Sequence, residues 1–153
     1  MSIEARLQEL GIHIPEAPKP VAAYVPFVRS GDLIFTSGQI ALEGGQLKYK
    51  GKVGRDLTPE EGYQAARLCA INTLAVLKAA VGSLDKVAQI VKVVVFVNSA
   101  DGFTGQPAVA NGASELYQQV FGERGLHARS AVGVSELPMD TATEVEVIAR
   151  IAE

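Results

Sequence analysis

The sequence predicts an α+β fold, with two long helices on one face of a single mixed β-sheet. Three features predict it: a strong helix start at Thr58, a second helical segment within residues 103–121, and short β-like runs before, between and after these helices. Strands and helices in this mixed order are typical of a two-layer sandwich. We expect one domain over residues 1–153, because a chain of 153 residues leaves little room for two.

Residues 1–11 are predicted to form an extra N-terminal helix. Ser2 can cap this helix and Gly11 can end it. Its apolar residues recur at helical spacing on one stripe, namely Ile3, Leu7 and Leu10. Residues 12–21 contain several prolines, so we expect extended and irregular chain there.

Three strands are expected before the first long helix. The first covers residues 21–28, where Pro26 favours an edge strand. The second covers residues 33–41 and contains Gly38, and the third covers residues 46–50. Turn residues separate these segments, so we expect the start of a hairpin meander.

The first long helix is predicted to run from Thr58 to about Val81. Thr58 can be its N-cap, Pro59 suits the first helical position, and Glu61 completes a capping box. The buried face is expected to be Ala66, Cys69, Ala70, Thr73, Leu74 and Leu77. We therefore expect Cys69 to be a core residue rather than a nucleophile.

Residues 87–97 are predicted to form a strand that is apolar on both faces. Its odd positions are apolar at Val91, Val93, Val95 and Val97. Its even positions are apolar too, apart from Lys92. Such a strand is covered on both faces. Since helices can cover only one face, we expect a partner subunit on the other.

The second long helix is predicted to begin near Pro107 and to end near Phe121. Two last strands are expected over residues 127–134 and 141–152. The predicted order of elements is therefore βββαβαββ.

Composition excludes several classes of protein. The chain is 48% hydrophobic and 20% charged, as in an ordinary globular domain. Its net charge of -3 gives no electrostatic footprint for a nucleic-acid backbone. One cysteine excludes an internal disulfide, and neither a signal peptide nor a membrane segment is recognisable. We expect a soluble, cytoplasmic protein.

Arg129 is the first candidate site residue. The face of its strand also carries Ala131 and Gly133, so we expect the arginine to lie over open space, as on a pocket wall. A guanidinium binds a carboxylate through two parallel hydrogen bonds, which also fix its orientation. The alternative is a surface arginine in a salt bridge, since most arginines are solvated.

The last strand carries two carboxylates on one face, Glu144 and Glu146, with apolar residues on the other face. One of them could position or deprotonate a water molecule. The alternative is a solvated strand face. The pattern does not choose between the two glutamates.

Several segments resemble, in the same order, the Rid/YjgF family of reactive intermediate deaminases, which also carries L-PSP endoribonuclease-like names. Residues 128–134, the pair Leu137-Pro138 and residues 144–149 resemble its C-terminal signature. That signature reads A-R-S/T-x-V-x-V, then L-P, then a strand that bears a glutamate. Earlier matches are Tyr24, the S-G-Q strand over residues 35–40 and the V-K-x-x-V-F-V strand over residues 91–97.

The resemblance implies a chorismate-mutase-like fold, a homotrimer and ligand clefts between its subunits. It implies hydrolysis of small enamine or imine carboxylates, such as 2-aminoacrylate, to 2-keto acids and ammonia, with no metal or organic cofactor. By motif, Arg129 would hold the substrate carboxylate and Glu144 would help position the attacking water. By motif, Tyr24 and Ser37 would also line the pocket. The backbone around Gly38 and Ala131 would bind the amino group or water.

The chain departs from the family at several positions. His127 stands where many members have proline; it could reach the cleft, and the alternative is a rim histidine with no task. Asn111 is the nearest match to the second-helix asparagine of the family, at an unusual spacing from Arg129. We count both residues with the substrate-binding set.

Two other functions compete with deamination. A non-catalytic trimer that binds small carboxylates, or acts as a chaperone, is favoured by the divergent segment Val25-Pro26-Phe27 after Tyr24. An endoribonuclease or translation inhibitor is the third reading, and the negative charge argues against it.

Overall fold

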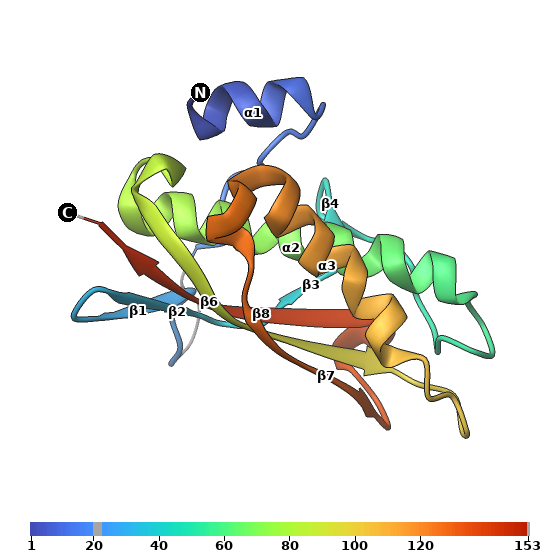
Figure 1. The fold of residues 1–153 in the computed structure, drawn as a ribbon. Coiled ribbons are helices and arrows are strands. Elements are labelled where there is room, and N and C mark those ends of the chain that lie inside the picture. Colours follow the sequence, from blue (N-terminus) through green and yellow to red (C-terminus); the bar gives the residue numbers. More distant parts are fainter. Residues whose placement is uncertain (20–22, 153) are drawn as a thin grey trace.

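Two long helices and a six-stranded sheet form the two main layers of the fold (Figure 1). The computed structural model describes residues 1–19 and 23–152. The helices are α1 (Ile3–Glu9), α2 (Pro59–Val81) and α3 (Gln106–Phe121). The strands are β1 (Phe27–Ser30), β2 (Leu33–Thr36), β3 (Gln39–Ile40), β4 (Leu42–Glu43), β5 (Gln46–Leu47), β6 (Val87–Asn98), β7 (Ala128–Val134) and β8 (Thr143–Ile151). Short 3₁₀ turns cover Leu84–Lys86, Gly122–Gly125 and Pro138–Asp140.

The main sheet is mixed, as predicted. Its strands run in the order β1-β2-β8-β6-β7, and β3 also pairs with β8. Only the β6–β7 pair is parallel among the pairings of the described strands in this sheet, and α3 makes the crossover between them. Both long helices lie on one face of the sheet (Figure 1), so the predicted α+β class and layer arrangement are confirmed.

Local sequence signals explain α2. The Thr58 side chain accepts a hydrogen bond from the backbone N–H of Glu61 at 3.1 Å, and the Glu61 carboxylate accepts one from the N–H of Thr58 at 3.0 Å. Such a cap is worth about 1 kcal/mol. The six residues predicted for its buried face are all buried. Burial raises the pKa of the Cys69 thiol to about 12, so this cysteine is inert at neutral pH.

The core lies between the helices and one face of the sheet. Val93, Val95 and Val97 of β6 are buried on that face. Val91 does not join them, because β6 has an irregularity in its register between Ile90 and Lys92. This bulge buries Ile90 and leaves Val91 37% exposed, so Val91 does not share the buried face of the other odd positions.

The other face of the sheet has no helix on it within the described part of the chain (Figure 1). Register places the side chains of Phe35, Ile148 and Lys92 on this face, with Val132 further along β7. Phe35 is 39% exposed and Val132 is 43% exposed. We call this the open face.

Three predicted strands need correction. Residues 33–41 form two short strands instead of one, because the strand is interrupted at Ser37–Gly38. There the N–H of Ser37 bonds to the carbonyl of Pro26 at 2.7 Å. The predicted strand at residues 46–50 is only β5, and it pairs with β4 in a separate small sheet. The first strand begins at Phe27, directly after Pro26, and is an edge strand; Val21 lies outside the described residues.

Helix α1 is fixed to the 3₁₀ turn that follows α2 and to the last turns of α3. Ile3 and Leu7 are buried, and the N–H of Ile3 donates to the Asp85 carboxylate at 2.7 Å. The Arg6 Nε donates to the carbonyl of Gln119 at 2.8 Å. Across residues 1–19 and 23–152, no helix combines the length and apolar character needed to span a membrane.

Candidate functional site

Arg129 lies on β7 opposite Val93, so it projects from the face of the sheet that α3 covers. Its Nη1 donates to Asn111 Oδ1 at 2.8 Å and to Ser114 Oγ at 3.2 Å, both on α3. Within the described residues, no carboxylate lies at ion-pair distance from Arg129. The alternative, in which Arg129 forms a surface salt bridge, is therefore not supported by any carboxylate of the described residues.

The expected open space beside Arg129 is only partly present. A Cβ built on Gly133 would lie 2.7 Å from Gln106 Nε2 and 2.8 Å from Ser99 Oγ, so those two side chains fill that space. Ala131 packs against the hydrophobic core. The expectation of open space is wrong at these two positions, because α3 begins above them with Gln106.

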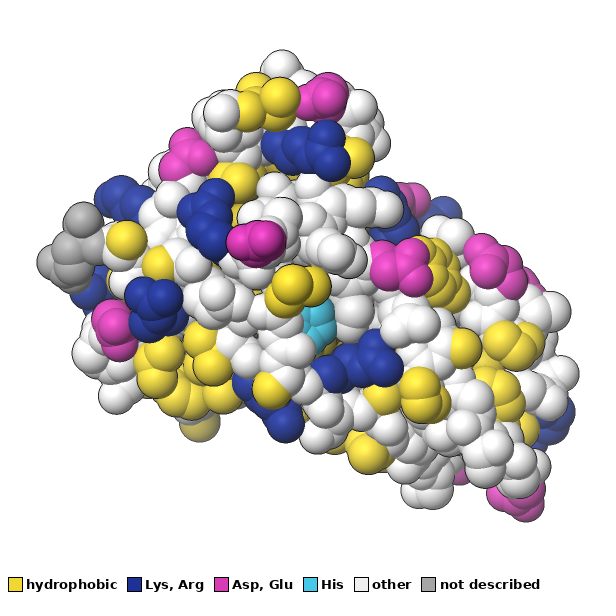
Figure 2. Space-filling model, viewed as in Figure 1, with side chains coloured by type: hydrophobic (Ala, Val, Ile, Leu, Met, Phe, Trp, Pro, Cys, Tyr) yellow, Lys and Arg dark blue, Asp and Glu magenta, His cyan; other side chains and the backbone are white. Residues whose placement is uncertain are grey.

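His127 packs beside Arg129 but is fixed by protein atoms at both ring nitrogens. Its Nδ1 lies 2.7 Å from the carbonyl of Gly125, and its Nε2 lies 2.8 Å from Ser114 Oγ. The ring stands edge-on to Tyr117, with centroids 5.8 Å apart. Burial, with the nearby Arg129 charge, lowers the pKa of His127. On the side of α3, Figure 2 shows histidine atoms beside a basic side chain.

Glu144 forms the centre of a second cluster. It lies on β8 opposite Phe96, and therefore on the open face. A Cβ on Gly38 would lie 2.8 Å from the Glu144 Cδ, so only glycine permits this close approach of the carboxylate. Burial, and then the charge of Glu146, raises the pKa of Glu144.

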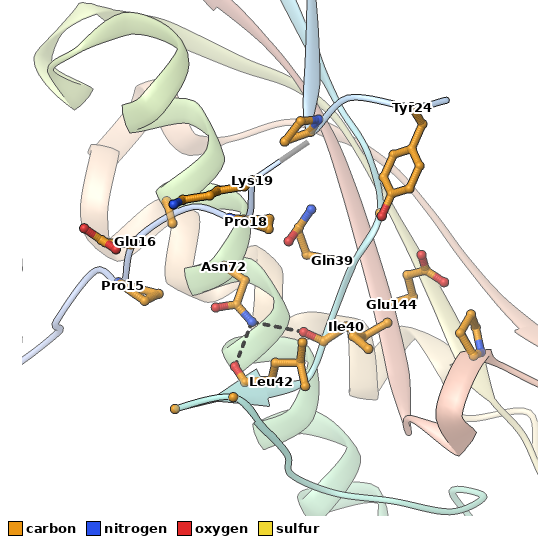
Figure 3. Close-up of a pocket in the computed structure, with 16 residues that line it drawn as sticks. Pro15, Glu16, Pro18, Lys19, Tyr24, Gln39, Ile40, Leu42, Asn72 and Glu144 are labelled. Carbon is orange, nitrogen blue, oxygen red and sulfur yellow. Dashed lines mark hydrogen bonds between the residues drawn. The ribbon is translucent and has the colours of Figure 1, made fainter. Parts of the chain in front are cut away.

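A hollow of about 440 Å³ adjoins Glu144 and extends past β3 to α2. Figure 3 shows Tyr24 and Glu144 on one side of it and Asn72 on the other. The chain before β1 forms part of its wall, through Pro15, Glu16, Pro18 and Lys19. Ser37 does not line the hollow; its hydroxyl donates to the carbonyl of Val25 at 2.6 Å.

Six of the eight predicted site residues thus fall into two clusters, and Ser37 and Ala131 belong to neither. The first, which we call the arginine cluster, contains Arg129, Asn111, Ser114 and His127. The second, the glutamate cluster, contains Glu144, Gly38 and Tyr24. Because Arg129 and Glu144 project from opposite faces of one sheet, a single chain does not bring them together.

Sequence reasoning gave no site role to two polar residues of these regions. Ser114 follows Asn111 by three positions, and that spacing places both on one face of α3. Asn72 on α2 donates to the carbonyls of Ile40 at 3.0 Å and Leu42 at 2.9 Å, and so holds β3 and β4 to the helix. Among the side chains the structure describes, no group of three His, Cys, Asp or Glu residues could hold a metal ion.

Comparison with known proteins agrees with the fold. The profile of the YjgF/chorismate mutase-like family, whose description adds endoribonuclease, matches residues 4–151. Protein TCP17 of Trypanosoma cruzi is 45% identical over 150 residues, which are 97% of this chain and 94% of that protein. The 2-iminobutanoate/2-iminopropanoate deaminase of Dermatophagoides farinae is 31% identical over 137 residues, 90% of this chain and 92% of that protein.

Solved structures show the same relationship. The Agrobacterium tumefaciens protein Atu1372 is 45% identical, with a TM-score of 0.92 over 98% of this chain and 92% of that one. Escherichia coli TdcF, solved with bound serine, is 30% identical, with a TM-score of 0.61 over 90% of this chain and 94% of that one. This chain belongs to the YjgF/chorismate mutase-like family.

Proposed function

We propose that this protein hydrolyses small enamine or imine carboxylates to 2-keto acids and ammonia. The observation that carries the proposal is the guanidinium of Arg129, which is held by two neutral groups and has no carboxylate partner among the described residues. A partly buried cation without a counter-ion is costly, so an anionic ligand would stabilise it. The deaminase name of the Dermatophagoides farinae relative and the serine bound to TdcF are consistent with such a ligand.

We further propose that the protein is a homotrimer whose sites lie between subunits. The opposite orientation of Arg129 and Glu144 supports this, since the arginine cluster of one copy can meet the glutamate cluster of the next. The open face supports it too: Phe35 and Val132 are large apolar side chains that a second copy would cover.

The reaction needs few protein groups. An imine is already electrophilic at carbon, so water can add to it once the substrate carboxylate is fixed by Arg129. Glu144 accepts a proton from the attacking water and passes it to the imine nitrogen, which gives a carbinolamine. It then transfers the hydroxyl proton to the same nitrogen, so that ammonia leaves as the carbonyl forms. The raised pKa of Glu144 suits both transfers, because the carboxyl exchanges a proton more readily near neutral pH.

The test is release of keto acid from 2-aminoacrylate, or from imines that an amino-acid oxidase makes in situ. We expect the purified protein to accelerate release, Arg129→Ala to lose at least about tenfold, and Glu144→Gln to lose about 10²–10⁴-fold. Arg67→Ala is the matched arginine control, because Arg67 is half-buried and lines a different hollow, beside Glu43 and Lys48. Circular dichroism must show that each variant is folded.

Absence of acceleration with several imines would contradict the deaminase proposal. Saturable binding of pyruvate without turnover would instead support a carboxylate-binding trimer. RNA cleavage that depends on Arg129 would favour the endoribonuclease reading, a word that the family description also carries.

A further inference from the structure

A continuous chain of hydrogen bonds links Arg129 to the backbone through Ser114 and His127. Its protons can be assigned by elimination. The carbonyl of Gly125 only accepts, so His127 Nδ1 carries the proton, and Nε2 of the neutral ring is an acceptor. Ser114 therefore donates to Nε2, and its oxygen accepts from Arg129, which has no acceptor.

These hydrogen bonds determine which edge of the Arg129 guanidinium is available to bind a ligand. Ser114 and Asn111 both accept from Nη1, from neighbouring turns of α3. Across the part of the chain that the structure describes, neither Nε nor Nη2 of Arg129 has a hydrogen-bond partner. These two donors form the edge that binds a carboxylate through two parallel hydrogen bonds.

We propose that Ser114 and His127 are positioning residues that hold Arg129 with this edge toward the ligand, an inference that rests on the proposed function. His127 acts through Ser114 and does not touch the substrate, since both of its ring nitrogens are engaged. The Tyr117 ring packs edge-on to the imidazole and fixes its plane. Burial keeps the imidazole neutral by lowering its pKa, so that Nε2 remains an acceptor.

The first experiment measures pyruvate binding by calorimetry and steady-state kinetics on full-length variants. We expect Ser114→Ala and His127→Ala to weaken pyruvate binding and raise KM by about three- to tenfold, with a smaller change in kcat. His127→Gln should approach wild type, because its side-chain oxygen offers a neutral acceptor at a similar reach. His13→Gln, at an exposed position, is the matched control.

A merely structural role gives a different pattern. If His127 only fills space, alanine and glutamine would act alike. Equal losses in His127→Ala and His127→Gln overturn the proposal, and so does an unchanged KM in Ser114→Ala. A loss in kcat alone would also overturn it, because an arginine that binds the ground state affects KM.

The second experiment does not depend on activity. Nitrogen NMR of the imidazole rings, with His13→Gln to assign the two histidines, should show His127 as the Nδ1–H form. Its pKa should rise in Ser114→Ala, which removes the donor to Nε2, and in Arg129→Gln, which removes a nearby positive charge. An Nε2–H form, or an unchanged pKa in both variants, would overturn the proposed hydrogen-bond chain from Arg129 to His127. If wild type neither binds pyruvate nor turns over imines, the proposed function fails. The titration still tests whether the hydrogen bonds among Arg129, Ser114 and His127 form as proposed.

Discussion

If the site lies between subunits as proposed, two impaired variants should recover activity when their subunits are mixed. Arg129→Ala removes the arginine cluster's cation, and Glu144→Gln removes the carboxylate of the glutamate cluster. Because these residues project from opposite faces of one sheet, a site between copies takes each from a different chain. A mixed trimer can therefore contain a site with both native groups.

The size of the recovery follows from counting. With equal amounts of the two variants and random assembly, each site draws its arginine and its glutamate from two independently chosen chains. About one quarter of the sites would then be fully native, so about one quarter of the wild-type rate is expected. One quarter of the sites would carry both defects, and the rest one defect each.

The assay is imine hydrolysis after joint unfolding and refolding, with two different tags to prove that mixed trimers form. Arg129→Ala mixed with Asn111→Ala is the control, because both changes damage the arginine cluster and every site stays defective. Verified mixed trimers without activity would refute a site shared between copies. Activity in the control mixture would show that the recovery has another cause.

Other perturbations have expected outcomes of their own. The pKa of Glu144 is raised in the folded protein, so its contribution to stability is present below the ordinary value of about 4.5 and is lost as pH rises through the folded value. Glu144→Gln should therefore raise the free energy of unfolding at pH 7.5 more than at pH 4. Denaturant titrations test this, and an equal change at both pH values would contradict it. The lowered pKa of His127 has the opposite sense, because its stabilising contribution is present above pH 6.5 and is lost as pH falls through the folded value. His127→Gln should therefore flatten the decline of the free energy of unfolding below pH 6.5. Phe35→Glu places a charge on the open face and should shift the protein toward monomer in analytical ultracentrifugation; an unchanged mass would argue against an interface there. Cys69 is fully buried, so a disulfide reagent should label it only after denaturant is added, and rapid labelling of the native protein would show that this part of α2 opens.

The sequence predicted well the elements that local signals define. Helix α2 begins with a capping box at Thr58, and its end at Gly82 follows from a glycine with positive φ. The break at Ser37–Gly38 was not predictable in the same way. At the break, the N–H of Ser37 bonds to the carbonyl of Pro26, and the Glu144 carboxylate lies against Gly38. Both are tertiary contacts, which the local sequence does not reveal.

The sequence named candidate residues for the site but not their geometry. Strand β7 reads Ala-Arg-Ser-Ala-Val-Gly-Val, which has no clear alternation, so the face of Arg129 could not be assigned. That face follows from pairing with β6, a tertiary contact. The link between Arg129 and Asn111 was hidden for the same reason, since their contact crosses from a strand to a helix.

The attachment of α1 has a consequence for variants far from the hollow. The same leading segment supplies Pro15, Glu16 and Lys19 to its wall, while its helix is tied to Asp85 and to the carbonyl of Gln119. The shape of the hollow therefore depends on anchors outside it. A fusion at the amino terminus, or a change at Asp85, would alter the wall without replacing any residue that lines it, so a carboxyl-terminal tag is the better choice for the assays above.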